Sequence, residues 1–336
     1  MKYNFFLIIL LFPLISTQSG KINYSEPYDP TPKITKFSIG MARYFLRFSA
    51  MAYCPNSIIS KDCCHDFLQK EGWSIKAHGK VETTFENNFA IYRNDKYQKV
   101  VVAFPGTRGF LQLMDEILES GLQSIKIKDD KYSEIKIGKY FYKRADSLKS
   151  KVLTNLKYEL SKTKEYQIIF TGHSLGAAMA TIMAYFAKIN GVTNHVVLLT
   201  FGQPRTGNDV FSNEVMKAVD KVFRVVRAGD IVPTIPFSII GSSPRFRDSK
   251  FDYSYFPKDD LTKLENRLPW NNIYWSLGGL VLIDENQETY QIYDYDQGEN
   301  LDNCKIYGNI LGIQRYHNDY FGLIVKDECA AGKNED

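Results

Sequence analysis

The 336-residue chain carries 42 basic and 38 acidic residues, a formal net charge of +4, and only 24% of its residues are charged. Because lysines and acidic residues are interspersed along the chain, the sequence has no basic stripe, which argues against nucleic-acid binding. The chain is long enough for one large core and has no linker, low-complexity tract or internal repeat, so we expect a single domain over residues 20–336.

Residues 1–19 have the pattern of a secretory signal peptide. A basic residue at position 2 precedes an uncharged apolar run over residues 5–15, followed by small and polar residues. The run is too short to span a bilayer comfortably, so cleavage between Ser16 and Ser19 is favoured over an uncleaved anchor. We therefore expect a secreted protein, extracellular or in the lumen of the secretory pathway, with a glycosylation sequon at Asn23.

The apolar segment Lys99–Phe104 predicts a buried strand, and the loop Pro105–Gly109 follows it. The next residues, 110–122, have the periodicity of a two-sided helix. The large apolar residues on one half of this helix are Phe110, Leu111, Leu113, Met114, Ile117, Leu118 and Leu122.

Residues 166–181, YQIIFTGHSLGAAMAT, carry the most informative pattern of the chain. An apolar run ending at Thr171 predicts a strand and the small residues after Gly176 predict a helix, so Ser174 lies at a sharp strand-to-helix turn. Glycine is needed on both flanks because a side chain there would strike the adjacent strand or helix. This geometry is typical of a serine nucleophile; the alternative is a serine that caps the helix of an ordinary turn.

The histidine partner follows from chain order. In α/β hydrolases the nucleophile is followed by the acid and then by the histidine, and of five histidines only His195 and His317 come after Ser174. His195 begins a predicted strand, whereas sites on such sheets lie beyond the C-terminal ends of strands. His317, in a loop, is therefore the candidate base.

The acid is expected just past a strand between these two residues. Val222–Arg227 predicts such a strand, and Asp230 follows it directly, before prolines that stop the chain from re-entering the sheet. Asp209, which follows the predicted strand Val196–Phe201, is the rival, and its alternative role is that of a turn-forming aspartate.

An acyl-transfer site also needs hydrogen-bond donors for the oxyanion. The backbone N–H of Leu175, the residue after the nucleophile, is the first candidate. Thr107, in the loop after the strand Lys99–Phe104, is the second, through its N–H and its hydroxyl.

Five ordered motifs resemble the fungal-type triacylglycerol lipases, also called class 3 lipases. They are FPGTRG, TGHSLGAAMAT, TFGQPRTGN, DIVPTIP and RYHNDYF, and the resemblance runs from about Phe45 to Cys329. It implies an α/β-hydrolase fold, with a central, mostly parallel sheet flanked by helices and covered by a helical lid. It also implies that Ser174, Asp230 and His317 form the catalytic triad and that Thr107 and Leu175 form the oxyanion hole.

The resemblance also interprets the two-sided helix as a lid, closed in water and turned outward at a lipid surface. The lid residues are then Phe110, Leu113, Met114, Ile117 and Leu118, and Asp115 would accept a hydrogen bond from the Thr107 hydroxyl. Periodicity alone favours a surface helix that packs permanently on the core, whereas the location beside the predicted oxyanion loop and the resemblance favour the lid. The alternative for Asp115 is a solvated acid.

The chain has five cysteines, so at least one lacks an intramolecular partner. The resemblance implies a disulfide between Cys54 and Cys329, while Cys304 is either free or joined to Cys63 or Cys64. The spacing of Cys63, Cys64 and His65 does not suit metal ligation, so we expect no metal and no cofactor.

The sequence thus predicts a secreted serine esterase that hydrolyses acylglycerols at an oil-water or membrane interface, without an obligate protein partner. The alternatives are a phospholipase A1-type or other carboxylester hydrolase, and a catalytically silent lipid-binding relative that keeps the fold. Every catalytic position holds a competent residue, which favours the enzyme.

Overall fold

The computed structural model describes residues 18–54, 65–82, 86–107, 122–124, 135–161, 165–192, 194–235, 278–293 and 315–325. Within these ranges, nine strands form one sheet in the spatial order β1-β11-β10-β9-β8-β7-β4-β3-β2. Their bounds are β1 Gln18–Lys21, β2 Ser74–Glu82, β3 Glu86–Asn94, β4 Lys99–Phe104, β7 Gln167–His173, β8 Val196–Phe201, β9 Lys221–Arg227, β10 Leu280–Ile283 and β11 Thr289–Ile292.

The middle of the sheet is parallel and its edges are antiparallel. Strands β4, β7, β8, β9 and β10 pair in parallel, whereas β2 and β3 on one edge and β11 and β1 on the other run antiparallel to their neighbours. Phe104 lies opposite Gly172, and His173 lies opposite Phe201, so neighbouring strands end level with one another. The segments that leave these strands therefore emerge on the same side of the sheet, at the carboxyl ends of its parallel strands.

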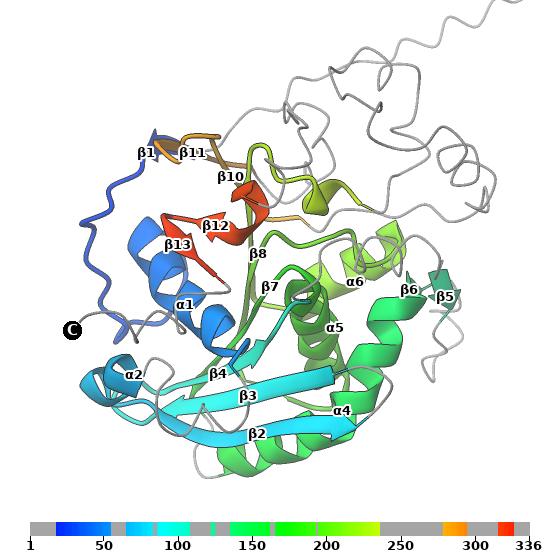
Figure 1. Cartoon of the computed structure of the whole chain (residues 1–336). Coiled ribbons are helices and arrows are strands. Elements are labelled where there is room, and N and C mark those ends of the chain that lie inside the picture. The colour runs from blue at the N-terminus through cyan, green and yellow to red at the C-terminus, as the bar shows by residue number, and fades with distance from the viewer. Residues whose placement is uncertain are drawn as a thin grey trace, which may run out of the picture.

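Helices cover both faces of the sheet (Figure 1). Helix α1 (Ile39–Met51) packs on one face, while α4 (Lys139–Ser161), α5 (Leu175–Ile189) and α6 (Asp209–Ala218) pack on the other. Shorter elements complete the described part of the chain: α2 (His65–Glu71), the 3₁₀ turn Val232–Thr234, and the strand pairs β5–β6 (Leu122–Ser124, Lys136–Gly138) and β12–β13 (Asp319–Tyr320, Leu323–Ile324).

The sheet separates two apolar cores because side chains alternate along each strand. In β4, Val100, Val102 and Phe104 join the core beneath α4 and α5, whereas Val101 and Ala103 join the core beneath α1. Strands β4, β7 and β8 are buried along their whole length. This burial of both faces explains why their sequences read as continuous apolar runs.

The expected strands at 99–104, 166–171, 196–201 and 222–227 are confirmed as β4, β7, β8 and β9, and the helix after Ser174 is confirmed as α5. One expectation was wrong. Leu122, assigned to the end of the two-sided helix, begins strand β5 and pairs with Gly138 of β6. Helical periodicity cannot reveal this pairing, because the partner residue Gly138 lies sixteen residues further along the chain.

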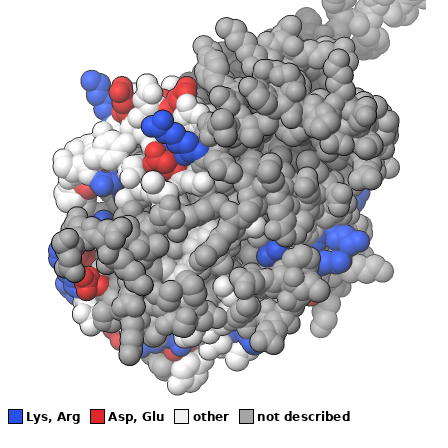
Figure 2. Space-filling model, viewed as in Figure 1, with Lys and Arg blue, Asp and Glu red and all other residues white. Residues whose placement is uncertain are grey.

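On the face of the molecule shown in Figure 2, the basic and acidic side chains of the described residues are mixed. Among the described helices, none is both long enough and apolar enough to cross a membrane. Strand β1 begins at Gln18, within the interval expected for signal cleavage, and pairs antiparallel with β11.

Candidate active site

Ser174 occupies a strained position between β7 and α5. Its φ of 60° and ψ of −130° lie outside the regions that residues with a side chain normally adopt. A conformation of this kind costs on the order of 1–3 kcal/mol and persists only where the surroundings enforce it. The serine is buried, with 1% of its surface exposed, and it has the backbone geometry expected of a nucleophile on a strand-to-helix turn.

Two glycines allow this turn to form. A Cβ atom on Gly172 would lie 2.3 Å from the backbone carbon of Gly176, and a Cβ atom on Gly176 would lie 2.1 Å from the carbonyl oxygen of Phe104. Both distances are far below van der Waals contact and both involve backbone atoms, so no side chain can be accommodated. The glycines predicted to flank the nucleophile are therefore required by close backbone packing.

The loop after β4 lies against this turn. A Cβ atom on Gly106 would meet the carbonyl oxygen of His173 at 2.7 Å and the Cβ of Ser174 at 3.0 Å, so the backbone next to Thr107 touches the serine. The Thr107 hydroxyl is buried and has no hydrogen-bond partner among the described residues. Leu175 is the first residue of α5, and the first N–H groups of a helix lack intrahelical acceptors. Both backbone segments named as oxyanion donors thus border Ser174.

His317 and Asp230 form a direct pair. The Nδ1 atom of His317 lies 2.9 Å from Oδ2 and 3.0 Å from Oδ1 of Asp230. Both side chains are almost completely buried. Asp230 follows β9, and the histidine lies 87 residues further along the chain. The carboxylate therefore fixes the imidazole with a proton on Nδ1, which leaves Nε2 as the proton acceptor of the ring.

Asp230 accepts two further hydrogen bonds. The backbone N–H of Val232 donates to Oδ1 at 2.9 Å, and the Tyr320 hydroxyl donates to Oδ2 at 2.6 Å. Burial and, next, the neighbouring Asp230 carboxylate raise the pKa of Tyr320 well above its usual range, which keeps the hydroxyl protonated. These donors stabilise a carboxylate that is otherwise cut off from water.

A second histidine joins this pair to the serine. His173, which immediately precedes Ser174, donates from Nε2 to the carbonyl oxygen of His317 at 2.6 Å. The Tyr53 hydroxyl is 2.8 Å from Nδ1 of His173. Since a carbonyl can only accept, Nε2 carries the proton and Nδ1 accepts from Tyr53. His317 is thereby held next to the turn that carries Ser174.

Within the described residues, the Nε2 atom of His317 is buried and forms no hydrogen bond, so none joins it to the Ser174 hydroxyl. Catalytic hydrogen bonds are often long in enzymes without substrate and shorten in the complex. The ring of His317 lies against that of His173, the residue that precedes Ser174, with ring centroids 4.5 Å apart.

Asp209 and His195, the alternative candidates for the acid and the base, lie outside the site. Asp209 is exposed in the first turn of α6, where Asn208 caps the helix by accepting from the Phe211 N–H. His195 lies just before β8, at the opposite end of the sheet, with its Nδ1 atom 3.1 Å from Asp220. The structure thus brings Asp230 and His317 together and leaves Asp209 and His195 outside the site.

Other expected residues fall outside the described residues. These are the lid residues Phe110, Leu113, Met114, Ile117 and Leu118, the proposed Thr107 partner Asp115, and the cysteines Cys63, Cys64, Cys304 and Cys329. Cys54 is described and is disulfide-bonded; its pairing with Cys329 stays a prediction. The roles of Tyr53, His173 and Tyr320 in the site were not predicted from the sequence, although His173 and Tyr320 belong to two of the five motifs.

A mostly parallel sheet with a strained serine at a strand-to-helix turn, and a histidine-aspartate pair beside it, defines the α/β hydrolases. Comparison with known proteins narrows this class. The family model described as lipase (class 3) matches residues 101–239. Lipase ZK262.3 of Caenorhabditis elegans is 29% identical over 242 residues, which cover 70% of this chain and 63% of that protein.

Comparisons with a second lipase sequence and with a solved lipase structure give similar results. The lipase of Rhizomucor miehei is 24% identical over 212 residues, covering 62% of this chain and 56% of that protein, so less than two thirds of either relative is matched. A solved triacylglycerol lipase whose catalytic centre is formed by a serine protease triad superposes with a TM-score of 0.65 and 19% identity, covering 93% of this chain and all of that one. The chain is thus similar to the class 3 lipases, whose family model matches residues 101–239.

Proposed function

We propose that this protein is a secreted serine esterase that hydrolyses the carboxylic esters of acylglycerols. The observation that carries the proposal is the buried Asp230–His317 pair, 2.9 Å apart, beside the strained turn at Ser174. Its relatives support the same activity, since those compared with it are named lipases. Strands β7 and β9, which precede Ser174 and Asp230, end on the same side of the sheet, where α/β enzymes place their sites.

In the proposed reaction, the Ser174 hydroxyl attacks the ester carbonyl while Nε2 of His317 takes its proton. Asp230 orients the imidazole and stabilises the imidazolium that forms. His317 then gives the proton to the leaving alcohol, which leaves an acyl group on Ser174. A water molecule, activated by His317 in the same way, releases the fatty acid and regenerates the serine.

The negative oxygen of each tetrahedral intermediate needs donors that are already in place. The backbone N–H of Leu175 is one, and the positive end of the α5 dipole adds to it. Thr107 provides the other through its N–H and its buried hydroxyl, which has no competing partner among the described residues.

The remaining parts of the proposal concern the compartment and the interface. The signal peptide lies within residues 1–19 and is cleaved between Ser16 and Ser19, and the rest of the chain forms the single secreted domain. We propose that the segment that begins at Phe110, which lies outside the described residues and is predicted from the sequence to be helical, acts as a lid whose apolar residues turn toward lipid when it opens. The substrate is therefore taken from an oil-water or membrane interface.

The proposal is tested by comparing hydrolysis of triacylglycerol, phosphatidylcholine and a soluble short-chain ester by the wild type and by Ser174→Ala. Triad members act as a unit, so the variant loses activity by a factor of thousands or more while keeping its fold, as checked by circular dichroism. Preferred release of the sn-1 acyl chain from phosphatidylcholine would instead assign a phospholipase A1. Binding of lipid without turnover in the wild type would indicate a catalytically silent relative.

A further inference from the structure

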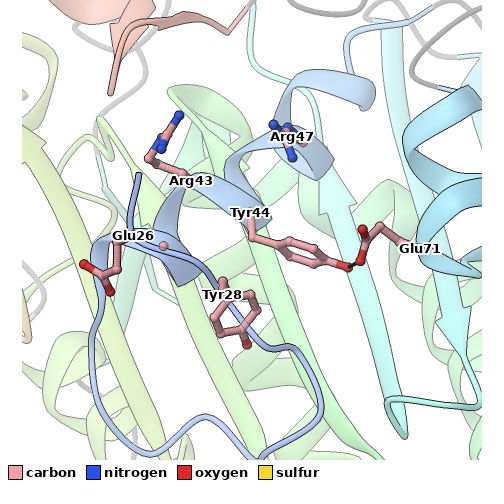
Figure 3. A pocket seen from close by; sticks show the side chains of 7 residues that line it. Glu26, Tyr28, Arg43, Tyr44, Arg47 and Glu71 are labelled. Carbon is pink, nitrogen blue, oxygen red and sulfur yellow. Dashed lines mark hydrogen bonds between the residues drawn. The ribbon is translucent and has the colours of Figure 1, made fainter. Parts of the chain in front are cut away.

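A cavity of about 210 Å³ lies at the N-terminal half of α1, away from Ser174. It is formed by α1, the extended segment before it and the end of α2, and its lining residues are Glu26, Tyr28, Gly40, Arg43, Tyr44, Arg47 and Glu71 (Figure 3). Arg43 precedes Tyr53, which contacts His173, by ten residues. At 1.5 Å per residue, the cavity is on the order of 15 Å from the catalytic site along α1.

Two arginines of this cavity have no acidic partner among the described residues. Arg43 and Arg47 lie one helical turn apart and, in the view of Figure 3, on the same side of the Tyr44 ring. Arg43 packs over the ring of Tyr24, with Cζ 5.4 Å from the centroid, and Arg47 packs over Phe67 at 5.0 Å. Neither forms an ion pair within the described residues. Aromatic support of this kind fixes a guanidinium face and leaves its N–H edge for a ligand.

Two donors in the cavity are buried and unused. Arg43 donates from Nη1 to the carbonyl oxygen of Tyr24, but its Nε atom is buried and has no hydrogen-bond partner in the described part of the chain. The same holds for the Tyr28 hydroxyl. Burial raises the pKa of Tyr28, so this hydroxyl remains a donor. Buried donors without acceptors are unfavourable, and beside two unpaired cations they point to an oxyanion.

The cavity also has a side suited to a cation. The Glu71 Oε2 atom accepts hydrogen bonds from the hydroxyls of Tyr44 and Tyr97, at 3.3 and 3.2 Å. Neither Glu71 nor Glu26 is paired with a basic residue among those described. The rings of Tyr28 and Tyr44, with centroids 5.1 Å apart, add electron-rich faces. Two arginines and two glutamates make the lining neutral, which favours a ligand that carries both charges.

We propose that this cavity binds a zwitterionic phosphodiester, with its phosphate on Arg43 and Arg47 and its ammonium group on Glu71 and the tyrosine rings. The two unesterified oxygens of a phosphodiester can each accept hydrogen bonds from one guanidinium group, and arginine is well suited to phosphate recognition. The same chemistry occurs in a soluble glycerophosphodiester and in the headgroup of a membrane phospholipid. The site lies outside the catalytic residues and is independent of the proposed esterase activity.

Glycerophosphocholine titrated into the full-length protein, followed by isothermal titration calorimetry, tests the proposal. We expect saturable binding that Arg43→Gln and Arg47→Gln each weaken at least tenfold. Lys70→Gln is the matched control, since it removes the same charge from an exposed position on α2, beside Glu71. Glu71→Gln is expected to weaken binding of glycerophosphocholine but not of inorganic phosphate.

Flotation with phosphatidylcholine vesicles separates the two sources. If less Arg43→Gln protein than wild type floats with the vesicles, the ligand is a membrane headgroup. If the same amount floats but the variant no longer binds glycerophosphocholine, the ligand is a soluble diester. Turnover of a soluble ester and thermal unfolding, both expected to match the wild type, show that the variants fold. If the wild type does not bind glycerophosphocholine saturably, or if the arginine variants bind it as well as the wild type, the proposed site is wrong. If the wild type binds inorganic phosphate with the same affinity as glycerophosphocholine, the role of the ammonium group is wrong.

Discussion

The imidazole of His173 lies against that of His317, with ring centroids 4.5 Å apart and an angle of 34° between the planes. The Nε2 atom of His173 also donates to the carbonyl oxygen of His317. The residue before the proposed nucleophile therefore contacts both the ring and the backbone of the proposed base. The Tyr53 hydroxyl donates to Nδ1 of His173 and helps to orient this ring, so the position of His317 depends on a residue 120 positions before His173.

Tyr53→Phe tests this dependence. The substitution removes the donor to Nδ1 of His173, so the ring that packs against His317 loses a hydrogen bond that orients it. A net hydrogen-bond contribution of about 1–1.5 kcal/mol corresponds to a roughly tenfold fall in kcat on a soluble ester, with little change in KM. Tyr166→Phe is the control, because this equally buried tyrosine loses a 2.9 Å bond to Asp95 at the other end of β7. Equal kinetics for the two variants would contradict a positioning role for Tyr53.

Tyr320→Phe removes one of the donors to Asp230 while leaving the Val232 N–H and His317 in place. A hydrogen bond to a charged group contributes about 1.5–3 kcal/mol, so we expect kcat to fall by about 10- to 100-fold. The loss is expected in kcat and not in KM, since the hydroxyl is fully buried and does not reach substrate. Steady-state kinetics on a soluble ester, with thermal unfolding as the check on folding, measures this. A change confined to the unfolding temperature would assign Tyr320 a structural role only.

Asp230→Asn and Asp209→Asn separate the two candidate acids. Asp230 contacts His317, whereas Asp209 is exposed at the start of α6. We expect Asp230→Asn to lower kcat by about 10⁴-fold, because an amide selects the wrong imidazole tautomer and cannot stabilise the cation. Asp209→Asn is expected to change activity less than twofold and to cost a few tenths of a kcal/mol through the helix dipole. Comparable losses in both variants would mean that the acid has been misassigned.

The strand ends that carry the site could be predicted because each is an apolar run followed by polar or turn-forming residues. Ser174, after β7, and Asp230, after β9, follow this rule. Tyr53 and Tyr320 could not be found in the same way, because each acts through a contact between segments about 90 to 120 residues apart. Leu122 shows the opposite error: periodicity favoured a helix, but the residue pairs with Gly138 in a strand. Pairing between distant segments is the information that a single sequence lacks.

Lys99 gives a prediction for the pH dependence of stability. It is almost completely buried on β4, and its Nζ atom donates to the carbonyl oxygen of Pro32 at 2.8 Å and, less closely, to those of Thr31 and Tyr97. Burial lowers the pKa of Lys99 to about 8, from an ordinary value of 10.5, and the nearby charge of Asp29 only partly offsets this.

Between these two pKa values the unfolded chain binds more protons at Lys99 than the folded protein does, so the contribution of Lys99 to the free energy of unfolding rises as the pH increases from about 8 to 10.5. At lower pH both states are protonated and the cost of burying the charge is present in full. Urea unfolding of the wild type and of Lys99→Met between pH 7 and 10 isolates this term, because ionisation of the tyrosines is common to both proteins. We expect the wild type to gain on the order of 2 kcal/mol relative to the variant across this range. A difference between the two proteins that stays constant with pH would show that Lys99 keeps its ordinary pKa in the fold.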